Sequence, residues 1–137
     1  MKIRECSTED AAELALMNKR LIDAEMSDNP MNEIQLQERM ISFLEGDYKA
    51  FFFEVENDNV GYALVKITSQ PLYLRQFFIE EKYRHMGYGR KAFQMLMKHL
   101  QADEINLDVL PWNKMGWDFW KKCGFIETCV SMKYLNA

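Results

Sequence analysis

Residues 72–90 read LYLRQFFIEEKYRHMGYGR, and this stretch decides the fold. Its first eight residues are apolar on both faces of a strand, apart from Arg75 and Gln76. A strand of this kind is normally covered on both sides by other elements. Gly87 and Gly89 then stand at the beginning of an amphipathic helical pattern. The stretch therefore predicts a central strand, a short charged loop and a helix that begins at a glycine-containing turn.

Upstream of this strand, the sequence predicts two helices followed by a hairpin. Helical periodicity covers residues 8–25, and it resumes at Leu36 and stops at Gly46. Aromatic and β-branched residues then predict strands over 50–56 and 60–68, which are joined by a cluster of asparagine and aspartate. We expect an antiparallel hairpin here and a short strand at the N-terminus.

Downstream, the sequence predicts a β-α-β unit and a closing segment. The helix that begins near Gly87 is followed by an alternating strand over 105–110, a helix over 112–123 and one or two strands within 125–135. This order predicts one domain, residues 1–137, of the α/β or α+β class. We expect a mixed, mostly antiparallel central sheet of six to seven strands with helices on both faces.

Composition excludes several classes of protein. A chain of 137 residues, 48% of them hydrophobic, can bury one core but not two. It has no apolar run of the roughly 18 residues that a membrane helix needs, and its N-terminus reads as a strand, so we expect a cytoplasmic protein with no membrane partner. Three cysteines without C-x-x-C spacing and two distant histidines predict neither a disulfide framework nor a metal site.

Charge is distributed unevenly along the chain. The net charge of -4 argues against a nucleic-acid partner, because such binding needs a basic surface. Residues 82–91 nevertheless contain four basic residues and no acid, so the rest of the chain carries -8. We therefore expect one positive patch on an acidic body.

The positive patch coincides with the beginning of the glycine-containing helix, which favours an anion site. Glycines leave room for several backbone N–H groups to approach one anion, and the helix dipole adds positive potential. Arg84 and Arg90 add further charge at the same point. We predict that an anion binds there. The predicted residues are Arg84, His85, Met86, Gly87, Tyr88, Gly89 and Arg90.

A dinucleotide fingerprint is the main alternative interpretation of these glycines. Residues 87–92 satisfy G-x-G-x-x-A, and Asp108 lies at a suitable distance downstream. However, the fingerprint should follow its strand immediately, whereas the charged residues 80–85 intervene here. Too few alternating units remain for a doubly wound domain, and no G-x-x-x-x-G-K-[ST] supports a nucleotide triphosphatase. The context therefore disfavours nucleotide binding of either kind.

Two motifs together resemble the GNAT superfamily of N-acetyltransferases. The central GNAT signature, [RQ]-x-x-G-x-[GA] after a hydrophobic strand, is matched by Arg84, Gly87 and Gly89, although the common proline before it is Glu81. A second block, roughly N-x-x-A-x-x-F-[YF]-x-x-x-G-F, is met in the correct order by Asn113, Gly116, Phe119, Trp120, Gly124 and Phe125. The resemblance covers essentially the whole chain and implies the GNAT fold.

The resemblance implies that acetyl-CoA binds in a cleft between two parallel strands that splay apart. Main-chain groups of Phe77 and Ile79 would pair with the pantetheine arm like an added strand. Residues 85–90 would bind the pyrophosphate, and Asn113 would hydrogen-bond the pantetheine. Trp120, at the position of a family tyrosine, is assigned to the same cofactor site.

The resemblance also implies direct attack of a neutral amine on the thioester within a ternary complex. The tyrosine that commonly protonates the thiolate is Trp120 here, and an indole N–H is too weak an acid for that role. The strand position where some members carry a glutamate is Tyr73. Tyr73 and Gln76 are therefore the candidate catalytic residues, with packing within the sheet as the competing interpretation of each. Arg75 could equally be a structural ion-pair partner.

Charge is the only indication of which kind of molecule accepts the acetyl group. The connection between the first two helices holds the acids Asp23, Glu25, Asp28 and Glu33. Such acids suit a cationic amine, although a solvated loop is the commoner explanation. We expect acetyl transfer to a primary amine of a small cationic molecule. A noncatalytic acetyl-CoA binding module and a lysine or N-terminal protein acetyltransferase stay open, and a homodimer is an expected assembly.

Overall fold

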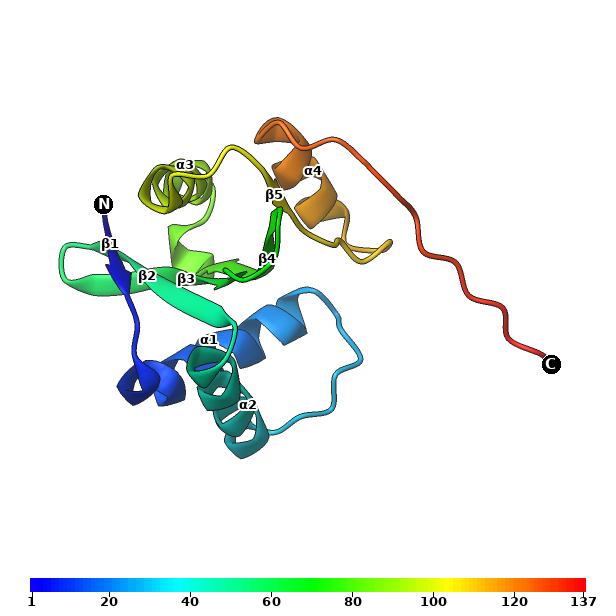
Figure 1. Ribbon diagram of the computed structural model, residues 1–137, viewed down its shortest axis with the longest axis horizontal. Helices are drawn as coiled ribbons and strands as arrows, with labels where there is room; N and C mark the ends of the chain where they lie inside the picture. The colour runs from blue at the N-terminus through cyan, green and yellow to red at the C-terminus, as the bar shows by residue number, and fades with distance from the viewer.

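The computed structural model describes all 137 residues, and its centre is one mixed sheet of five strands (Figure 1). The first four strands are antiparallel neighbours in chain order, whereas the fifth joins the fourth in parallel. The mixed, mostly antiparallel sheet predicted from sequence is confirmed. Its strands are β1 (Lys2–Glu5), β2 (Tyr48–Val55), β3 (Asp58–Lys66), β4 (Leu72–Ile79) and β5 (Ile105–Asn106).

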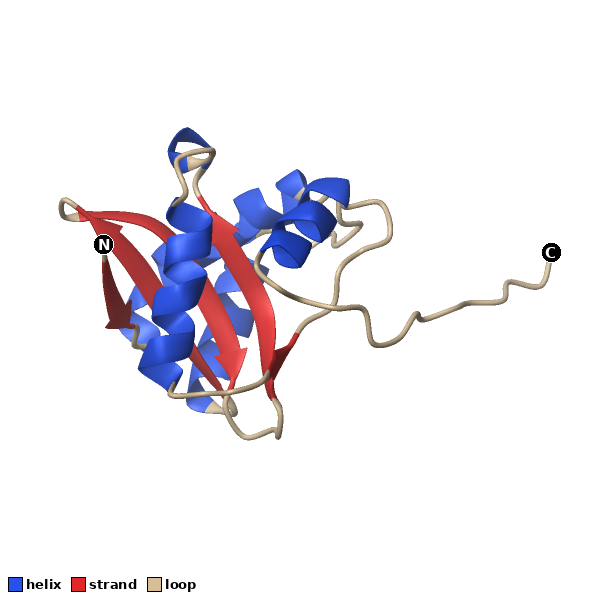
Figure 2. Ribbon diagram, turned by 90° about the horizontal axis from the view of Figure 1, so that it is seen from above, coloured by secondary structure: helices blue, strands red, loops and turns tan.

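Helices cover both faces of the sheet, as the sequence predicts. One core cluster joins α1 and α2 to one face, and a second joins α3 to the other face (Figure 2). No helix is both long enough and apolar enough to span a membrane. The helical elements are η1 (Thr8–Asp10), α1 (Ala11–Ala24), α2 (Glu33–Glu45), η2 (Glu81–Tyr83), α3 (Tyr88–Leu100) and α4 (Lys114–Lys122).

Three consecutive phenylalanines in β2 show how the sheet is buried on both sides. Phe52 belongs to the cluster under α1 and α2, whereas Phe51 and Phe53 belong to the cluster under α3. All three are at most 1% exposed. Successive side chains of a strand point to opposite faces, so an unbroken aromatic run fills both cores. Each fully buried ring contributes about 1.5–3 kcal/mol through the hydrophobic effect.

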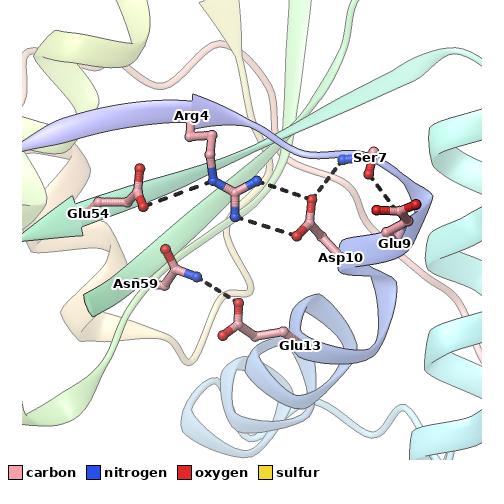
Figure 3. Close-up of polar contacts among 7 residues, drawn as sticks. All are labelled: Arg4, Ser7, Glu9, Asp10, Glu13, Glu54 and Asn59. Carbon is pink, nitrogen blue, oxygen red and sulfur yellow. Dashed lines mark hydrogen bonds and ion pairs between the residues drawn. The ribbon is translucent and has the colours of Figure 1, made fainter. Parts of the chain in front are cut away.

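Polar contacts at the surface fix the N-terminal strand to its neighbours (Figure 3). The guanidinium of Arg4 donates to both carboxylate oxygens of Asp10 at 3.3 and 3.4 Å and lies 4.0 Å from Glu54. The Asn59 amide donates to Glu13 at 2.7 Å, which ties the β2–β3 end of the sheet to α1. These contacts are exposed, so each contributes at most about 1 kcal/mol, and their main effect is to orient β1 and α1.

The prediction of six to seven strands is wrong, because two alternating segments have no strand neighbour. β5 pairs with β4 through two residue pairs only, the last of which is Tyr73 with Asn106, and residues 107–110 run on unpaired. The segment over 125–135 is extended but also unpaired. Alternation of apolar residues indicates which side chains can be buried. A strand also needs backbone hydrogen bonds to a neighbouring strand.

The close approach of β3 and β4 at Gly61 gives a test of the fold. A Cβ atom at this position would overlap the carbonyl oxygen of Phe78 and lie 2.9 Å from Cδ1 of Ile79. We expect Gly61→Ala to lower the free energy of unfolding by about 1–3 kcal/mol in urea denaturation, because the backbone of β4 must move. Lys49→Ala, at an exposed position of β2, should change it by about 0.5 kcal/mol or less. Equal effects of the two substitutions would contradict the close approach.

Candidate active site

The separation of β4 from β5 leaves one edge of β4 open. From Leu74 to Ile79, β4 pairs with β3 on one side and has no strand partner on the other. Figure 2 shows β5 beside one end of β4 only. Backbone N–H and C=O groups along such an edge can pair with an extended ligand. Phe77 and Ile79, which the sequence predicts to bind in this way, lie on the open stretch.

Helix α3 begins beyond the end of this open edge, with its first amides unpaired. No backbone N–H group of residues 85–90 makes a hydrogen bond within the chain. Gly87 caps the helix with φ 79°, and His85 also has a positive φ of 63°. Free N–H groups at a helix N-terminus, together with the helix dipole, favour an anion. The structure therefore gathers the predicted anion-binding residues beyond the end of the open β4 edge.

The two glycines of this turn serve different purposes. Gly87 has a left-handed backbone, and a Cβ atom there would meet nothing within 4 Å. Gly89 has ordinary helical geometry, but a Cβ atom there would lie 2.9 Å from Cε1 of Phe119 on α4. Gly87 is therefore required by the turn itself, whereas Gly89 allows α4 to pack against α3. The second purpose could not be inferred from the motif, because Phe119 is distant in sequence.

Arg84 holds the turn against β4 and also adds positive charge to it. Its Nε donates to the carbonyl oxygen of Ile79 at 2.8 Å, and its guanidinium lies 5.4 Å from the ring centre of Phe78. The loop between β4 and α3 is thus attached to the end of β4. The other predicted side chains of the turn are exposed or half-buried: His85, Met86, Tyr88 and Arg90.

Asn113 joins α4 to the end of α1. Its Oδ1 accepts a hydrogen bond from the N–H of Gly116 at 3.1 Å and so caps α4. Its Nδ2 donates to Glu25, at the end of α1, at 3.5 Å, and the neighbouring Trp112 donates to the carbonyl oxygen of Glu25 at 3.1 Å. The structure therefore assigns Asn113 a capping and bridging role, and its contact with a cofactor stays a prediction.

Trp120 lies in an aromatic cluster behind β4. Its ring centre is 5.1 Å from that of Phe77, 5.4 Å from Phe93, 4.7 Å from Phe119 and 5.1 Å from Phe125. Such edge-to-face contacts each add about 0.5–1.5 kcal/mol beyond the buried area. Trp120 thus supports the wall that Phe77 forms, and its direct contact with a cofactor stays a prediction.

Gln76 belongs to a buried polar network that joins the sheet to both helices of one face. The Tyr62 hydroxyl donates to Gln76 Oε1 at 2.7 Å, and Arg39 donates to Asn18 Oδ1 at 3.0 Å. Tyr62 is fully buried, and this burial raises the pKa of its hydroxyl well above the usual value. The carbonyl group of Gln76 is therefore already satisfied, which leaves its NH2 group as the part available to a ligand.

A β-bulge places Arg75 beside Gln76 on the same side of β4. The register of β4 against β3 shifts there, so Arg75 has no cross-strand partner. Its guanidinium lies 4.8 Å from the ring centre of Phe43 and donates to the Tyr48 hydroxyl at 3.3 Å. Arg39 lies over the same Phe43 ring at 5.4 Å, and no acid pairs with either arginine.

The two arginines give this face an uncompensated positive charge. Burial, and then the nearby charge of Arg75, lower the pKa of Arg39. The Nε of Arg39 is buried without a hydrogen-bond partner. A buried donor without a partner costs about 1–3 kcal/mol of stability.

Tyr73 pairs with Asp108 where β4 and β5 are still joined. The Tyr73 hydroxyl donates to Asp108 Oδ2 at 2.7 Å. Burial, followed by this hydrogen bond, raises the pKa of Tyr73 to about 12, so the hydroxyl stays protonated at neutral pH. The sequence analysis considered Asp108 only as part of the dinucleotide fingerprint and missed this contact. The available signal was a charged residue in the alternating segment 105–110, whose other polar residue, Asn106, is uncharged.

The four acids of the α1–α2 connection do not act together. Asp23, Asp28 and Glu33 are exposed, whereas Glu25 is half-buried against the beginning of α4. Burial raises the pKa of Glu25. No group of three or more histidine, cysteine, aspartate or glutamate side chains is arranged to hold a metal ion.

Comparison with known proteins identifies the architecture. A family model described as the acetyltransferase (GNAT) family matches residues 15–125. No curated protein sequence matches the chain.

Solved structures match the chain over nearly its whole length. A variant of the BH1408 protein from Bacillus halodurans is 22% identical, covers 100% of both chains and has a TM-score of 0.79. Aminoglycoside N-acetyltransferase AAC(6')-Iy in complex with CoA is 18% identical, covers 98% of this chain and 93% of its own, and has a TM-score of 0.76. Ribosomal-protein-alanine N-acetyltransferase from Brucella melitensis is 12% identical, covers 99% and 98%, and has a TM-score of 0.72. At these identities the similarity shows the fold alone.

Removing the hydroxyl of Tyr62 tests the buried network. Tyr62→Phe leaves Gln76 Oε1 without its donor, so we expect the free energy of unfolding in urea to fall by about 1–3 kcal/mol. Tyr73→Phe removes a hydrogen bond of similar length that is exposed to solvent, and it should cost less than about 1 kcal/mol. If Tyr62→Phe were as stable as the unmodified protein, the network would not support β4.

Proposed function

The chain belongs to the acetyltransferase (GNAT) family, and from this premise we propose that it is an acetyl-CoA dependent N-acetyltransferase. In this proposal residues 1–137 form a single acetyltransferase domain, and the acceptor is a primary amine of a small cationic molecule. The observation that carries the proposal is the set of unpaired amides over residues 85–90 beside the open edge of β4.

Acetyl-CoA fits the chemistry of the free amides of residues 85–90 and of the open edge of β4. Its pyrophosphate would accept hydrogen bonds from the free amides of 85–90, next to the positive charges of Lys82, Arg84 and Arg90. Its pantetheine arm is extended and carries amide groups that can pair with the open edge of β4. Acetyl-CoA supplies the activated acyl group as a thioester. The arm would lead from α3 along β4 towards Tyr73.

The proposed reaction is direct acyl transfer. The neutral amine attacks the thioester carbonyl carbon, so that a C–N bond forms and the C–S bond breaks, and the thiolate takes up a proton. A proton must also leave the amine, and the chain offers a path for it through Tyr73. The Tyr73 oxygen can accept a hydrogen bond from the amine or from water, while its own proton is directed to Asp108. Gln76 would orient a reactant through its NH2 group.

Two groups of opposite charge constrain the acceptor. The half-buried carboxylate of Glu25 gains from an ammonium group placed beside it, because burial has cost this carboxylate part of its hydration. Arg39 and Arg75 would repel a second positive charge. An acceptor with two amino groups, one held as an ammonium beside Glu25 and one that reacts as the neutral amine beside Tyr73, keeps its positive charge away from the two arginines.

A noncatalytic acetyl-CoA binding module is the second candidate, and one observation favours it. Trp120 occupies the position of the usual proton donor and is packed among phenylalanines, which leaves no evident acid for the thiolate. A protein acetyltransferase is the third. Release of the CoA thiol with polyamines, aminoglycosides and lysine peptides separates the three, since the module turns over none of them and a protein acetyltransferase turns over peptides only.

Donor binding is tested by placing an acid at the anion site. We expect acetyl-CoA to raise the Tm of the protein and NADH to leave it unchanged. Gly87→Asp should abolish the shift, because it adds a negative charge and strains a turn with φ 79°. Gly124→Asp is the matched control, since Gly124 also has a positive φ, 103°, but lies after α4. Loss of the shift in both variants, or in neither, would contradict the proposed site.

The acceptor side is tested by steady-state kinetics with saturating acetyl-CoA. Tyr73→Phe should lower kcat by about 10²–10⁴-fold with little change in acceptor KM, because a proton-transfer group is lost. Glu25→Gln should raise the acceptor KM with little change in kcat, because an ammonium partner is lost. Exposed Asp28→Asn is the matched control and should change neither parameter. If Tyr73→Phe kept full kcat, the proton path would be wrong.

A further inference from the structure

Two arginine side chains meet between α2 and β4 without an acid to neutralise them. The guanidinium of Arg39 on α2 lies 5.4 Å from the ring centre of Phe43, and that of Arg75 on β4 lies 4.8 Å from the same ring centre. No aspartate or glutamate forms an ion pair with either guanidinium. Burial, and then the charge of Arg75, lower the pKa of Arg39, because the two positive charges repel each other. The pair therefore lacks a counter-ion within the chain.

Both guanidiniums keep hydrogen-bond donors that the chain does not use. A guanidinium has five N–H donors in a planar fork. Arg75 makes one hydrogen bond, to the Tyr48 hydroxyl at 3.3 Å, and Arg39 makes one, to Asn18 Oδ1 at 3.0 Å. Arg75 is exposed, and Arg39 is half-buried. A carboxylate matches the unused donors, because it accepts two parallel hydrogen bonds from such a fork.

The β-bulge brings Arg75 close to both candidate catalytic side chains. The register shift leaves Arg75 without a cross-strand partner and places it on the side of Gln76. Gln76 keeps its NH2 group free, because only its Oε1 is used, by the Tyr62 hydroxyl. Burial and Asp108 raise the pKa of Tyr73, and the charge of Arg75 opposes part of this rise. A ligand bound by Arg75 would therefore lie beside the candidate catalytic groups.

Glu25 adds one negative group to the same region. Burial raises the pKa of the Tyr62 hydroxyl, the charge of Glu25 adds to this rise, and the charge of Arg39 opposes it. Glu25 nevertheless forms no ion pair with Arg39 or Arg75. The region thus offers one acid and two bases that do not neutralise each other. A ligand that carries both a carboxylate and an ammonium group would pair with all three.

We propose that Arg39 and Arg75 bind a carboxylate of the acceptor, which is therefore an amino acid with a second amino group, of the lysine or ornithine class. This inference rests on the proposed function and adds to it the anionic group of the acceptor. Glu25 would hold the ammonium group, and the amine that reacts would lie beside Tyr73. Such a molecule has two amino groups and one carboxylate, so it is still a cation. A diamine of the same length lacks the group that the arginines bind and meets only their repulsion.

The first test compares acceptors that differ only in the carboxylate. Free lysine is matched by cadaverine, and ornithine by putrescine. With saturating acetyl-CoA, we expect the amino acid of at least one pair to have a kcat/KM about 10–100-fold above that of its diamine, as for the loss of a hydrogen-bonded charged group. The amide of that amino acid keeps both amines but no anion, so it should react like the diamine. Equal or higher kcat/KM for the diamine in both pairs would overturn the proposal.

The second test removes the arginines one at a time. Arg39→Gln and Arg75→Gln should each lower kcat/KM for the amino acid about 10–100-fold, and most of its advantage over the diamine should disappear. Arg4→Gln is the matched control, since Arg4 also lies over a phenylalanine ring, 5.1 Å from the ring centre of Phe52, but on the opposite edge strand β1. This control should keep the full preference. If Arg39→Gln and Arg75→Gln lowered kcat/KM equally for amino acid and diamine, the arginines would not recognise the carboxylate.

Binding measurements separate this inference from the proposed function. In calorimetry with CoA present, the amino acid should bind the unmodified protein, and it should bind Arg75→Gln about 10–100-fold more weakly. This result without turnover of any amine would contradict the proposed acetyl transfer and support the carboxylate site. Turnover of amines that lack a carboxylate, with no binding of lysine or ornithine, would support acetyl transfer and refute the carboxylate site.

Discussion

The early separation of β4 from β5 is the constraint on which the rest of the structure depends. Two residue pairs join these strands, and beyond Tyr73 the edge of β4 is free. Had the strands stayed together, the hydrogen-bonding groups of this edge would be used within the sheet. Because they part, an extended ligand can take the place of a strand, and α3 begins where such a ligand would leave the sheet.

The open edge of β4 presents backbone groups, whereas its face under α1 and α2 presents polar side chains. The bulge at Arg75 adds a second polar side chain to that face. Along the free edge, backbone groups are available to an extended ligand. On the face under α1 and α2, the bulge places Arg75 beside Gln76, and the Tyr62 hydroxyl holds Gln76 in position. Rigid placement of polar groups is what catalysis by orientation needs. The buried Tyr62–Gln76 hydrogen bond gives that rigidity, and the NH2 group of Gln76 stays available to a ligand.

Patterns within short stretches of the sequence predicted those parts of the fold that depend on residues close together in the chain. The bounds of β4 agree with its run of apolar residues, and the beginning of α3 follows from Gly87, where a positive φ favours glycine. Contacts between distant residues were not predictable: the Tyr73–Asp108 pair, the packing of Gly89 against Phe119 and the two arginines over one phenylalanine. The missing strand at 125–135 has the same origin, because alternation does not say whether a segment finds a partner strand.

The most direct measurement of the central claim is a titration of ¹⁵N-labelled protein with acetyl-CoA, followed by amide chemical shifts. The account predicts that the largest changes fall on the N–H groups of residues 85–90, where the pyrophosphate would bind, and on the open edge of β4 over 74–79. The amides of β1 and β2 should change little. Changes that spared residues 85–90 and the open edge of β4, or that spread evenly over the protein, would contradict the account.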